Sequence, residues 1–119
     1  MKVYTGYFGG MRHYVGLRFV AISRSVPVGL KWRVPNCRAL NPTRGILQMK
    51  DRPAEYEKVY GELLGKLDAN EILNSISLMS QDKDCVLLCY EKPGTFCHRH
   101  LVSKWLNKEL GIEVEEVKI

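Results

Sequence analysis

The fold is decided by residues 85–110, which read CVLLCYEKPGTFCHRHLVSKWLNKEL. The apolar run Cys85–Tyr90 is typical of a central, parallel strand, because only such a strand is covered on both faces. The turn Glu91–Gly94 contains a Pro-Gly pair and ends the strand. Thr95 can then cap a helix over Phe96–Leu110. The stretch therefore predicts a strand, a turn and a helix, the unit from which parallel α/β sheets are built.

Further strands and helices are indicated on both sides of this unit. Lys2–Phe8 has the composition of a short strand, and Leu17–Ile22 is nearly all apolar, as expected inside a sheet. Residues 53–66 carry tyrosines and leucines at helical spacing, and a capping box opens a second helix over residues 68–79. Residues 112–119 alternate apolar side chains with glutamates, which predicts an edge strand.

Residues 23–52 show no sustained periodicity and contain proline or glycine at five positions. Irregular segments of this length are uncommon in compact domains, so we expect either a binding loop or a hidden short helix. The whole pattern predicts an α/β fold: a single three-layer domain over residues 1–119, with a mostly parallel sheet flanked by helices and a long irregular loop after the second strand. The first two strands are joined by a short connection, which leaves that pair either parallel or antiparallel.

Charge is unevenly distributed along the chain. The formal net charge is +5, but residues 1–52 hold 10 Lys or Arg against one Asp, a net +9, whereas residues 53–119 hold 8 basic against 12 acidic residues, a net −4. Seven of the eight arginines lie in the basic part, and the guanidinium fork matches phosphate and carboxylate oxygens. We therefore expect an anionic partner, with contact between the basic and acidic parts of the chain as the alternative.

No segment has the composition of a membrane span or a leader peptide. The longest apolar stretch is the six residues Cys85–Tyr90, far below the ~18–20 that a transmembrane helix needs. The amino terminus breaks into polar and glycine positions before an apolar core forms. We therefore expect a cytoplasmic protein with no membrane partner. In that reducing compartment the four cysteines are expected as thiols.

Nucleophilic and titratable residues concentrate where the strand 85–90 meets the helix 96–110. Ligands of open α/β sheets bind outside the carboxyl ends of the strands, and this turn lies at such an end. Cys97, His98 and Arg99 fall in the predicted first helical turn, where free N–H groups favour an anion or a thiolate. At about 100° per residue, His98 shares the buried helical stripe and His100 faces away. We expect His98 to point inward and Arg99 to clamp an anion.

Two chemistries need no metal. A Cys97 thiolate can act as a nucleophile, with His98 carrying the proton and Arg99 holding an anionic group. A pocket without catalysis would instead bind a phosphate or nucleotide at the helix N-terminus between Arg99 and Arg24. A phosphatase loop is not expected, because the Cys-x5-Arg spacing is absent.

A metal site is a third possibility for the same cluster. It would recruit Cys89 and Cys97 together with one histidine of the turn. The Cys-x7-Cys spacing matches no standard zinc pattern, and a fourth ligand would have to come from His13 or Cys37. We therefore predict no metal and no cofactor.

Several stretches together resemble a known family. Residues 86–106 hold Cys-Tyr-Glu followed by Cys-His-Arg, residues 3–8 read VYTGYF, residues 20–27 read VAISRSVP, and residues 55–67 form a helical segment. In these features the chain resembles the domain of unknown function 488 (DUF488) family. The resemblance implies a small intracellular α/β domain of bacterial, archaeal or phage type, and it implies no activity. Carried over by position, it points to a site made of Ser23, Arg24, Cys89, Glu91, Cys97, His98 and Arg99.

The candidate site residues form two sets. The catalytic candidates are Cys97, His98, Glu91 and Cys89. The candidates for binding an anion are Arg99, Arg24, Ser23 and Thr95.

The leading functional hypothesis is binding, with or without processing, of a phosphate-bearing ligand such as a nucleotide or a nucleic-acid end. One alternative is a non-enzymatic nucleic-acid-binding module that uses the basic part and exposed aromatic residues, Tyr14 and Trp32. Another is a redox or metal-binding domain built on Cys89 and Cys97. The sequence predicts no oligomeric state.

Overall fold

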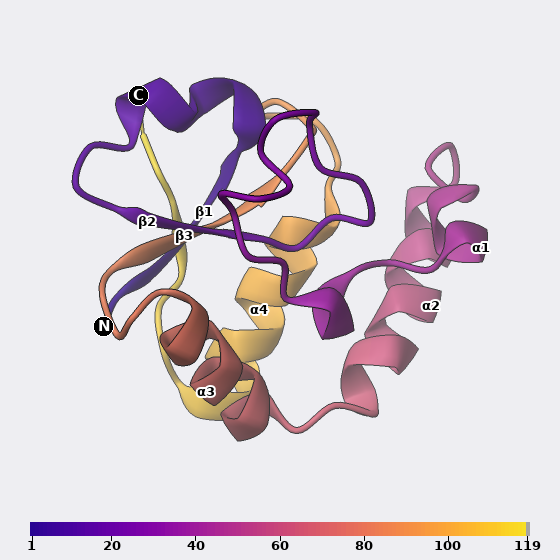
Figure 1. Ribbon diagram of the computed structural model, residues 1–119. Helices are drawn as coiled ribbons and strands as arrows, with labels where there is room; N and C mark the ends of the chain where they lie inside the picture. Colours follow the sequence, from indigo (N-terminus) through magenta and orange to yellow (C-terminus); the bar gives the residue numbers. More distant parts are fainter. Residues whose placement is uncertain (119) are drawn as a thin grey trace.

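The apolar run at residues 85–90 forms the central strand that its composition predicts. The computed structural model describes residues 1–118, and all five residues of β3 (Cys85–Cys89) are buried. β3 lies between β1 (Val3–Tyr7) and β2 (Arg18–Ala21), and β4 (Glu115–Glu116) pairs with the other side of β1. The strand order is therefore β2-β3-β1-β4, with the first three strands at the centre of Figure 1.

All neighbouring strands are parallel. Val3 of β1 and Arg18 of β2 both lie opposite Cys85 in register. The first two strands are thus parallel to each other, but β3 separates them. The short connection between them is a 3-10 helix, η1 (Phe8–His13), which crosses over the sheet. The predicted parallel α/β fold is confirmed, and the carboxyl ends of all four strands lie at one edge of the sheet.

Three α-helices lie on one side of the sheet: α2 (Pro53–Gly65), α3 (Ala69–Met79) and α4 (His98–Leu110). Helix α4 packs on β1 and β3, and α2 and α3 pack against α4 (Figure 1). Fully buried side chains from the sheet and these helices share one core, which includes Val20, Leu87, Tyr60, Ile76 and Leu106. The helices predicted at residues 53–66 and 68–79 are confirmed. Within the described residues, no helix has both the length and the apolar character needed to cross a membrane.

The opposite face is covered by η1 and by irregular chain, not by an α-helix. Phe8 and Tyr14 pack there together with Val34, against Val86 and Leu88 of β3. A third layer is present as predicted, but only a 3-10 helix and a loop form it. Apolar residues on both faces of β3 explain why its sequence shows no alternation.

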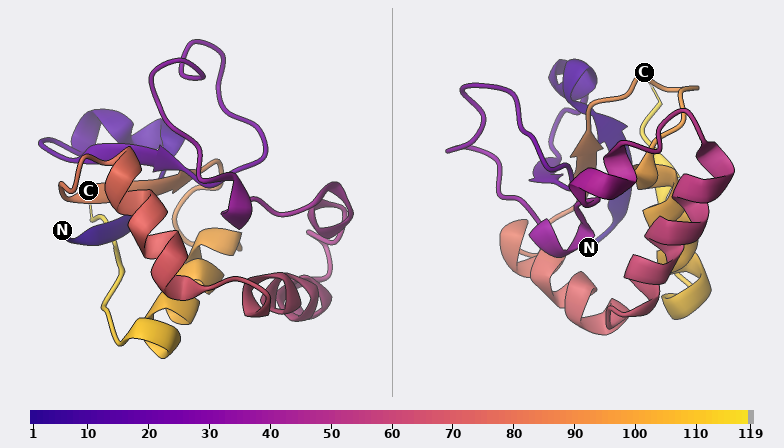
Figure 2. Two further views of the ribbon diagram at one scale, coloured as in Figure 1. Left: turned by 60° about the horizontal axis from the view of Figure 1, so that its bottom comes forward. Right: turned by 90° about the vertical axis from the view of Figure 1, so that its right-hand side faces the viewer.

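The irregular segment after β2 hides short helices, one of the two predicted outcomes. They are η2 (Arg38–Leu40) and α1 (Arg44–Leu47), and α1 is capped by Thr43, whose hydroxyl accepts from the N–H of Ile46. An isolated bridge between Ala21 and Asn36 returns the loop to the end of β2. In the left view of Figure 2 the purple chain between β2 and η2 projects beyond the layers. Most of this loop therefore lies outside the core.

Two predicted boundaries near the carboxyl end are corrected. Helix α4 begins at His98, and its N-cap is Cys97 in an extended conformation, not Thr95. The N–H of Thr95 instead donates to the carbonyl of Lys92, because the Pro-Gly turn continues to this residue. The edge strand predicted over residues 112–119 is limited to β4, with Ile119 outside the described residues.

Candidate functional site

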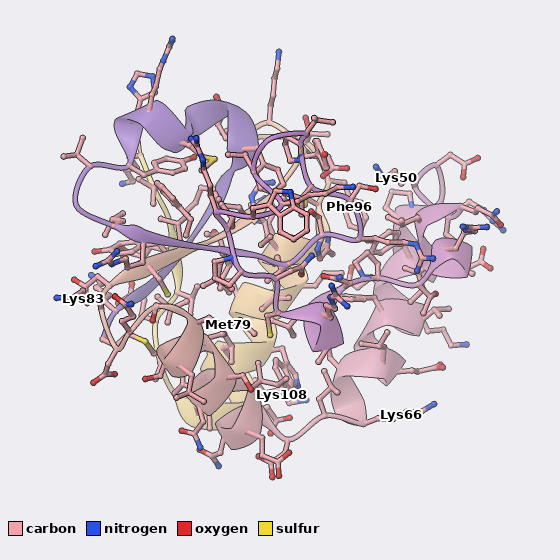
Figure 3. The ribbon with its side chains drawn as sticks, viewed as in Figure 1. Lys50, Lys66, Met79, Lys83, Phe96 and Lys108 are labelled. Carbon is pink, nitrogen blue, oxygen red and sulfur yellow. A yellow bond between two sulfur atoms is a disulfide. The ribbon has the colours of Figure 1, made fainter. Side chains whose placement is uncertain are left out.

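A pocket of about 340 Å³ opens at the carboxyl edge of the sheet, beyond the ends of β2 and β3. We call it the Cys97 pocket; it is lined by Ser23, Arg24, Ser25, Pro42, Leu47, Lys50, Tyr56, Tyr90, Glu91, Phe96, Cys97 and His98. Lys50 and Phe96, both labelled in Figure 3, line the same pocket although they are distant in sequence. The position agrees with the rule that parallel α/β sheets bind ligands beyond the carboxyl ends of their strands.

Five of the eight predicted site residues line this pocket: Ser23, Arg24, Glu91, Cys97 and His98. The other three do not. Cys89 and Arg99 are fully buried beside the pocket, and Thr95 is exposed on the turn. The structure thus places the Cys97 sulfur and the His98 imidazole at the pocket, whereas the Arg99 guanidinium lies elsewhere.

The sulfurs of Cys89 and Cys97 are joined by a disulfide. This corrects the expectation of four free thiols, which holds for Cys37 and Cys85. The fold brings the pair together because Cys89 ends β3 and Cys97 is the N-cap of α4, so both flank the same turn. Cys97 reaches the pocket and Cys89 does not. In the reduced form, Cys97 is therefore the thiol that a ligand can meet.

His98 is buried, as its helical position predicts, and its tautomer follows from its contacts. Nε2 lies 2.6 Å from the carbonyl oxygen of Ile22. A carbonyl only accepts hydrogen bonds, so Nε2 carries the hydrogen. Nδ1 keeps its lone pair and faces Sγ of Cys97 at 3.7 Å. Burial lowers the pKa of His98 to about 4, against the opposing effects of the Ile22 carbonyl and the Glu91 charge. The imidazole is therefore neutral at pH 7.

Arg99 is turned away from the pocket and bound inside the protein. Its Nε and Nη2 atoms donate to the carboxylate of Glu116, with Nη2 to Oε2 at 2.8 Å. Its Nη1 donates to the Glu91 carbonyl and to Sγ of Cys89, at 2.7 and 3.0 Å. The side chain is 0% exposed. The expected clamp for an external anion is therefore an internal clamp, because Glu116 of β4 already provides the negative charge.

The charges at the mouth of the pocket are Arg24, Lys50 and Glu91. Nζ of Lys50 bonds Oε1 of Glu91 at 2.6 Å. Burial would raise the pKa of Glu91, but the hydrogen bond and charge of Lys50 outweigh it and lower that pKa. Arg24 is exposed and forms no ion pair with any of residues 1–118. It is the group at the mouth best placed to meet an incoming anion.

Ser23 contributes to the shape of the pocket more than to its charge. Its hydroxyl donates to the carbonyl of Ser25 and so has no hydrogen left for a ligand. Asn36 donates to the Ser23 carbonyl at 3.0 Å. The bond from Asn36 joins the two ends of the loop after β2.

Sequence reasoning missed several residues of the pocket wall. Tyr56 and Phe96 stack edge to face with centroids 5.0 Å apart, and Tyr90 directly follows β3. Tyr56 belongs to the apolar stripe of α2, so it could be predicted only as core. Lys50 of the wall had no local signal, and neither had Glu116, which lies outside the wall and binds Arg99, since each meets its partner through a contact distant in sequence. Tyr90 alone could have been found, from its place at a strand end.

Cys89, Cys97 and His98 form the one group of potential metal ligands within residues 1–118, with ligand atoms within 4.8 Å of one another. Sulfurs joined in a disulfide carry no thiolate for a metal. In the reduced form, the Arg99 guanidinium against Cys89 would repel a cation. Neither expected fourth ligand belongs to the group: His13 is exposed on η1, and Cys37 is packed in the core. The arrangement favours thiol chemistry over metal binding.

Comparison with known proteins identifies the family. A family model named DUF488-N3a and described as the active DUF488-N3 subclade matches residues 22–110, which are 89 of the 119 residues. The chain belongs to the DUF488 family. The DUF488 match begins directly after β2 and ends with α4, so it includes every residue that lines the Cys97 pocket. Neither the curated proteins nor the solved structures contain a significant match to the chain.

Proposed function

We propose that this DUF488 protein binds a phosphate-bearing organic ligand in the Cys97 pocket and that the reduced Cys97 thiol reacts with it. The observation that carries the proposal is the meeting, in one pocket, of an exposed arginine without an ion-pair partner among residues 1–118 and a buried Cys97–His98 pair. The proposal places the protein in the cytoplasm, where the Cys89–Cys97 disulfide is open to reduction.

The pocket suits a small ligand with an anionic end and an apolar or aromatic body. Its volume lies near the lower end of the ~300–1,000 Å³ usual for small-molecule sites. Tyr56, Tyr90 and Phe96 supply aromatic walls. Arg24 offers a guanidinium fork for phosphate oxygens, and Lys50 adds a second cation when it leaves Glu91. A nucleotide has this combination of phosphate and planar ring.

The floor of the pocket supplies a nucleophile and a proton acceptor. When the Cys97 sulfur attacks an electrophilic atom of the ligand, its electron pair forms the new bond and its proton passes to Nδ1 of His98. The leaving group departs with the electrons of the broken bond. Burial and the charges of Arg99 and Lys50 disfavour the imidazolium that forms, and the negative charge of Glu91 offsets part of this effect, so the imidazolium is a transient carrier of the proton. Nε2 stays bonded to the Ile22 carbonyl throughout, which keeps the ring in place.

Thiol–disulfide exchange is a second candidate, favoured by the disulfide itself. Cys97 would attack a disulfide of a partner and release one thiol. Cys89 would then attack the Cys97 sulfur and release the second thiol, which leaves the Cys89–Cys97 disulfide. Nη1 of Arg99 donates a hydrogen bond to Sγ of Cys89. This bond stabilises the Cys89 thiolate, which is the attacking group in the second step.

Alkylation of Cys97 tests the first proposal. The reduced protein is treated with iodoacetamide, with inorganic phosphate or nucleoside monophosphates added, and modification of the Cys97 peptide is followed by mass spectrometry. We expect saturable protection of Cys97. Replacing Arg24 by alanine is expected to raise the half-protecting ligand concentration about 10-fold, as for a lost hydrogen bond to a charged group.

Lys92→Ala is the matched control, because Lys92 is an exposed cation of the same turn that does not line the pocket. It is expected to leave protection unchanged. Equal alkylation rates with and without saturating ligand would contradict phosphate binding. If the pair nevertheless exchanges with oxidised glutathione, the second candidate replaces the first.

A further inference from the structure

We propose that a second concavity, beside the Cys97 pocket, binds single-stranded nucleic acid. We call it the Trp32 groove; it has a volume of about 780 Å³ and is formed by the loop after β2 together with η2. This inference deepens the proposed function and rests on it in one respect: the strand would present a phosphate of its end to the Cys97 pocket. The groove itself is argued from its own residues.

The groove and the pocket adjoin each other. Arg24, Ser25 and Pro42 line both. Arg24 therefore stands at the junction, where one guanidinium can contact a phosphate that lies between the two concavities. An elongated ligand can occupy the groove with one end at Cys97, whereas a mononucleotide would fill only the smaller pocket.

Trp32 is presented to solvent without a role in packing. Its side chain is 95% exposed, whereas the other tryptophan, Trp105, is 9% exposed and belongs to the core. An indole on a projecting loop is a platform on which a base can stack, and stacking tolerates any base because every base has a π face. Tyr14, the other aromatic residue predicted to be exposed, is buried, with only 3% of its surface exposed. Its hydroxyl oxygen accepts a hydrogen bond from the backbone N–H of Tyr7. The platform is therefore Trp32 alone.

The charge of the groove indicates a polyanion. Its ionisable lining residues are Arg24, Lys31 and Arg38, all basic and exposed, and none of them forms an ion pair within residues 1–118. Phosphates of a nucleic-acid strand match such a row of cations, and the bases match the indole between them. A single strand is favoured over a duplex, because only unpaired bases offer their faces for stacking.

Binding of oligothymidylate of about eight nucleotides to the reduced full chain tests this inference. Fluorescence anisotropy of the labelled strand is measured at several salt concentrations, together with quenching of Trp32 emission. If Arg24, Lys31 and Arg38 each contact one phosphate, the slope of log affinity against log salt concentration is expected to be about −2. The Arg38→Ala variant loses one of these contacts, so the magnitude of its slope is expected to fall by about 0.7. Trp32→Ala is expected to weaken binding ~5- to 140-fold, the factor for ~1–3 kcal/mol per stacked base.

Two variants are matched controls. Trp32→Tyr keeps an aromatic face and is expected to retain most of the affinity. Arg18→Ala removes an exposed arginine at the start of β2, at the opposite edge of the sheet, and is expected to leave the salt slope unchanged. Absence of binding at low salt, tighter binding of a duplex of the same length, or equal affinity of the Trp32→Ala variant would each overturn the inference.

The outcome also separates this inference from the proposed function. If oligothymidylate quenches Trp32 but neither mononucleotides nor a strand with a terminal phosphate protect Cys97 from alkylation, the groove stands and the proposed function fails. If mononucleotides protect Cys97 but no strand binds, the proposed function stands and the groove inference fails.

Discussion

Replacing Glu116 by alanine is expected to lower the free energy of unfolding by about 3 kcal/mol. Glu116 is the carboxylate partner of Arg99, whose side chain is 0% exposed, and removal of one member of a buried ion pair leaves an uncompensated charge. The expected loss is near the lower end of the ~3–5 kcal/mol known for such pairs, because Glu116 itself is 25% exposed. Urea unfolding at pH 7 measures it.

Glu115→Ala is the matched control for this experiment. Glu115 is the other residue of β4, it is exposed, and it forms no ion pair with residues 1–118. Its replacement is expected to change stability by less than about 0.5 kcal/mol. The Glu116→Gln variant keeps the shape but loses the charge, so its stability is expected to fall between the two. A Glu116→Ala loss no larger than that of Glu115→Ala would show that the ion pair does not stabilise the fold.

Acidification is expected to destabilise the protein through His98. Burial lowers the pKa of His98 in the folded protein to about 4 from an ordinary 6.5. The unfolded chain therefore binds a proton at His98 that the folded chain does not, so stability is present above pH 6.5 and lost as the pH falls toward 4. Between pH 7 and pH 5 we expect His98 to account for a loss of about 2 kcal/mol. The pKa values of Glu91 and Glu116 are also lowered in the folded protein. Protonation of these carboxylates reduces the free energy of unfolding further, but only at lower pH.

Two measurements check this prediction. The drop in unfolding free energy between pH 7 and pH 5 is compared in the wild type and in His98→Gln, which lacks the imidazole and should show the smaller drop. NMR titration of the wild type follows the His98 ring directly, with a midpoint expected near pH 4 and the hydrogen on Nε2. A midpoint at or above pH 6.5 would contradict the neutral, buried imidazole.

Much of the fold could be predicted because its signals are local. The apolar run of β3, the Pro53 start of α2 and the Asp68 cap of α3 each act within a few residues, and each is found where the sequence indicates. The start of α4 was misplaced because Thr95 is a good capping residue by type. The chain continues its turn through this residue and caps the helix with Cys97, whose side chain accepts no capping hydrogen bond. Such competition between turn and helix depends on the tertiary contacts of the turn.

Local signals in the sequence also located part of the candidate site. Cys97 and His98 lie next to each other at a helix start, so helical geometry alone places His98 inward. Arg99 was assigned to an external anion because its partner, Glu116, lies 17 residues away in a two-residue strand. Pairing of Cys89 with Cys97 was only an alternative in the sequence analysis, because the reducing compartment, and not the distance between the cysteines, decided the leading expectation of free thiols. Contacts between segments far apart in sequence therefore account for the errors in the site.

The central claim is that a phosphate-bearing ligand lies over Cys97, and a crystal structure of the reduced protein with a nucleoside monophosphate tests it most directly. We expect a phosphate within hydrogen-bond distance of the Arg24 guanidinium, the ring against the aromatic wall of Tyr56 and Phe96, and Sγ of Cys97 facing the ligand. A Cys97 pocket that stays empty at saturating nucleotide, or a nucleotide bound elsewhere on the chain, would contradict it.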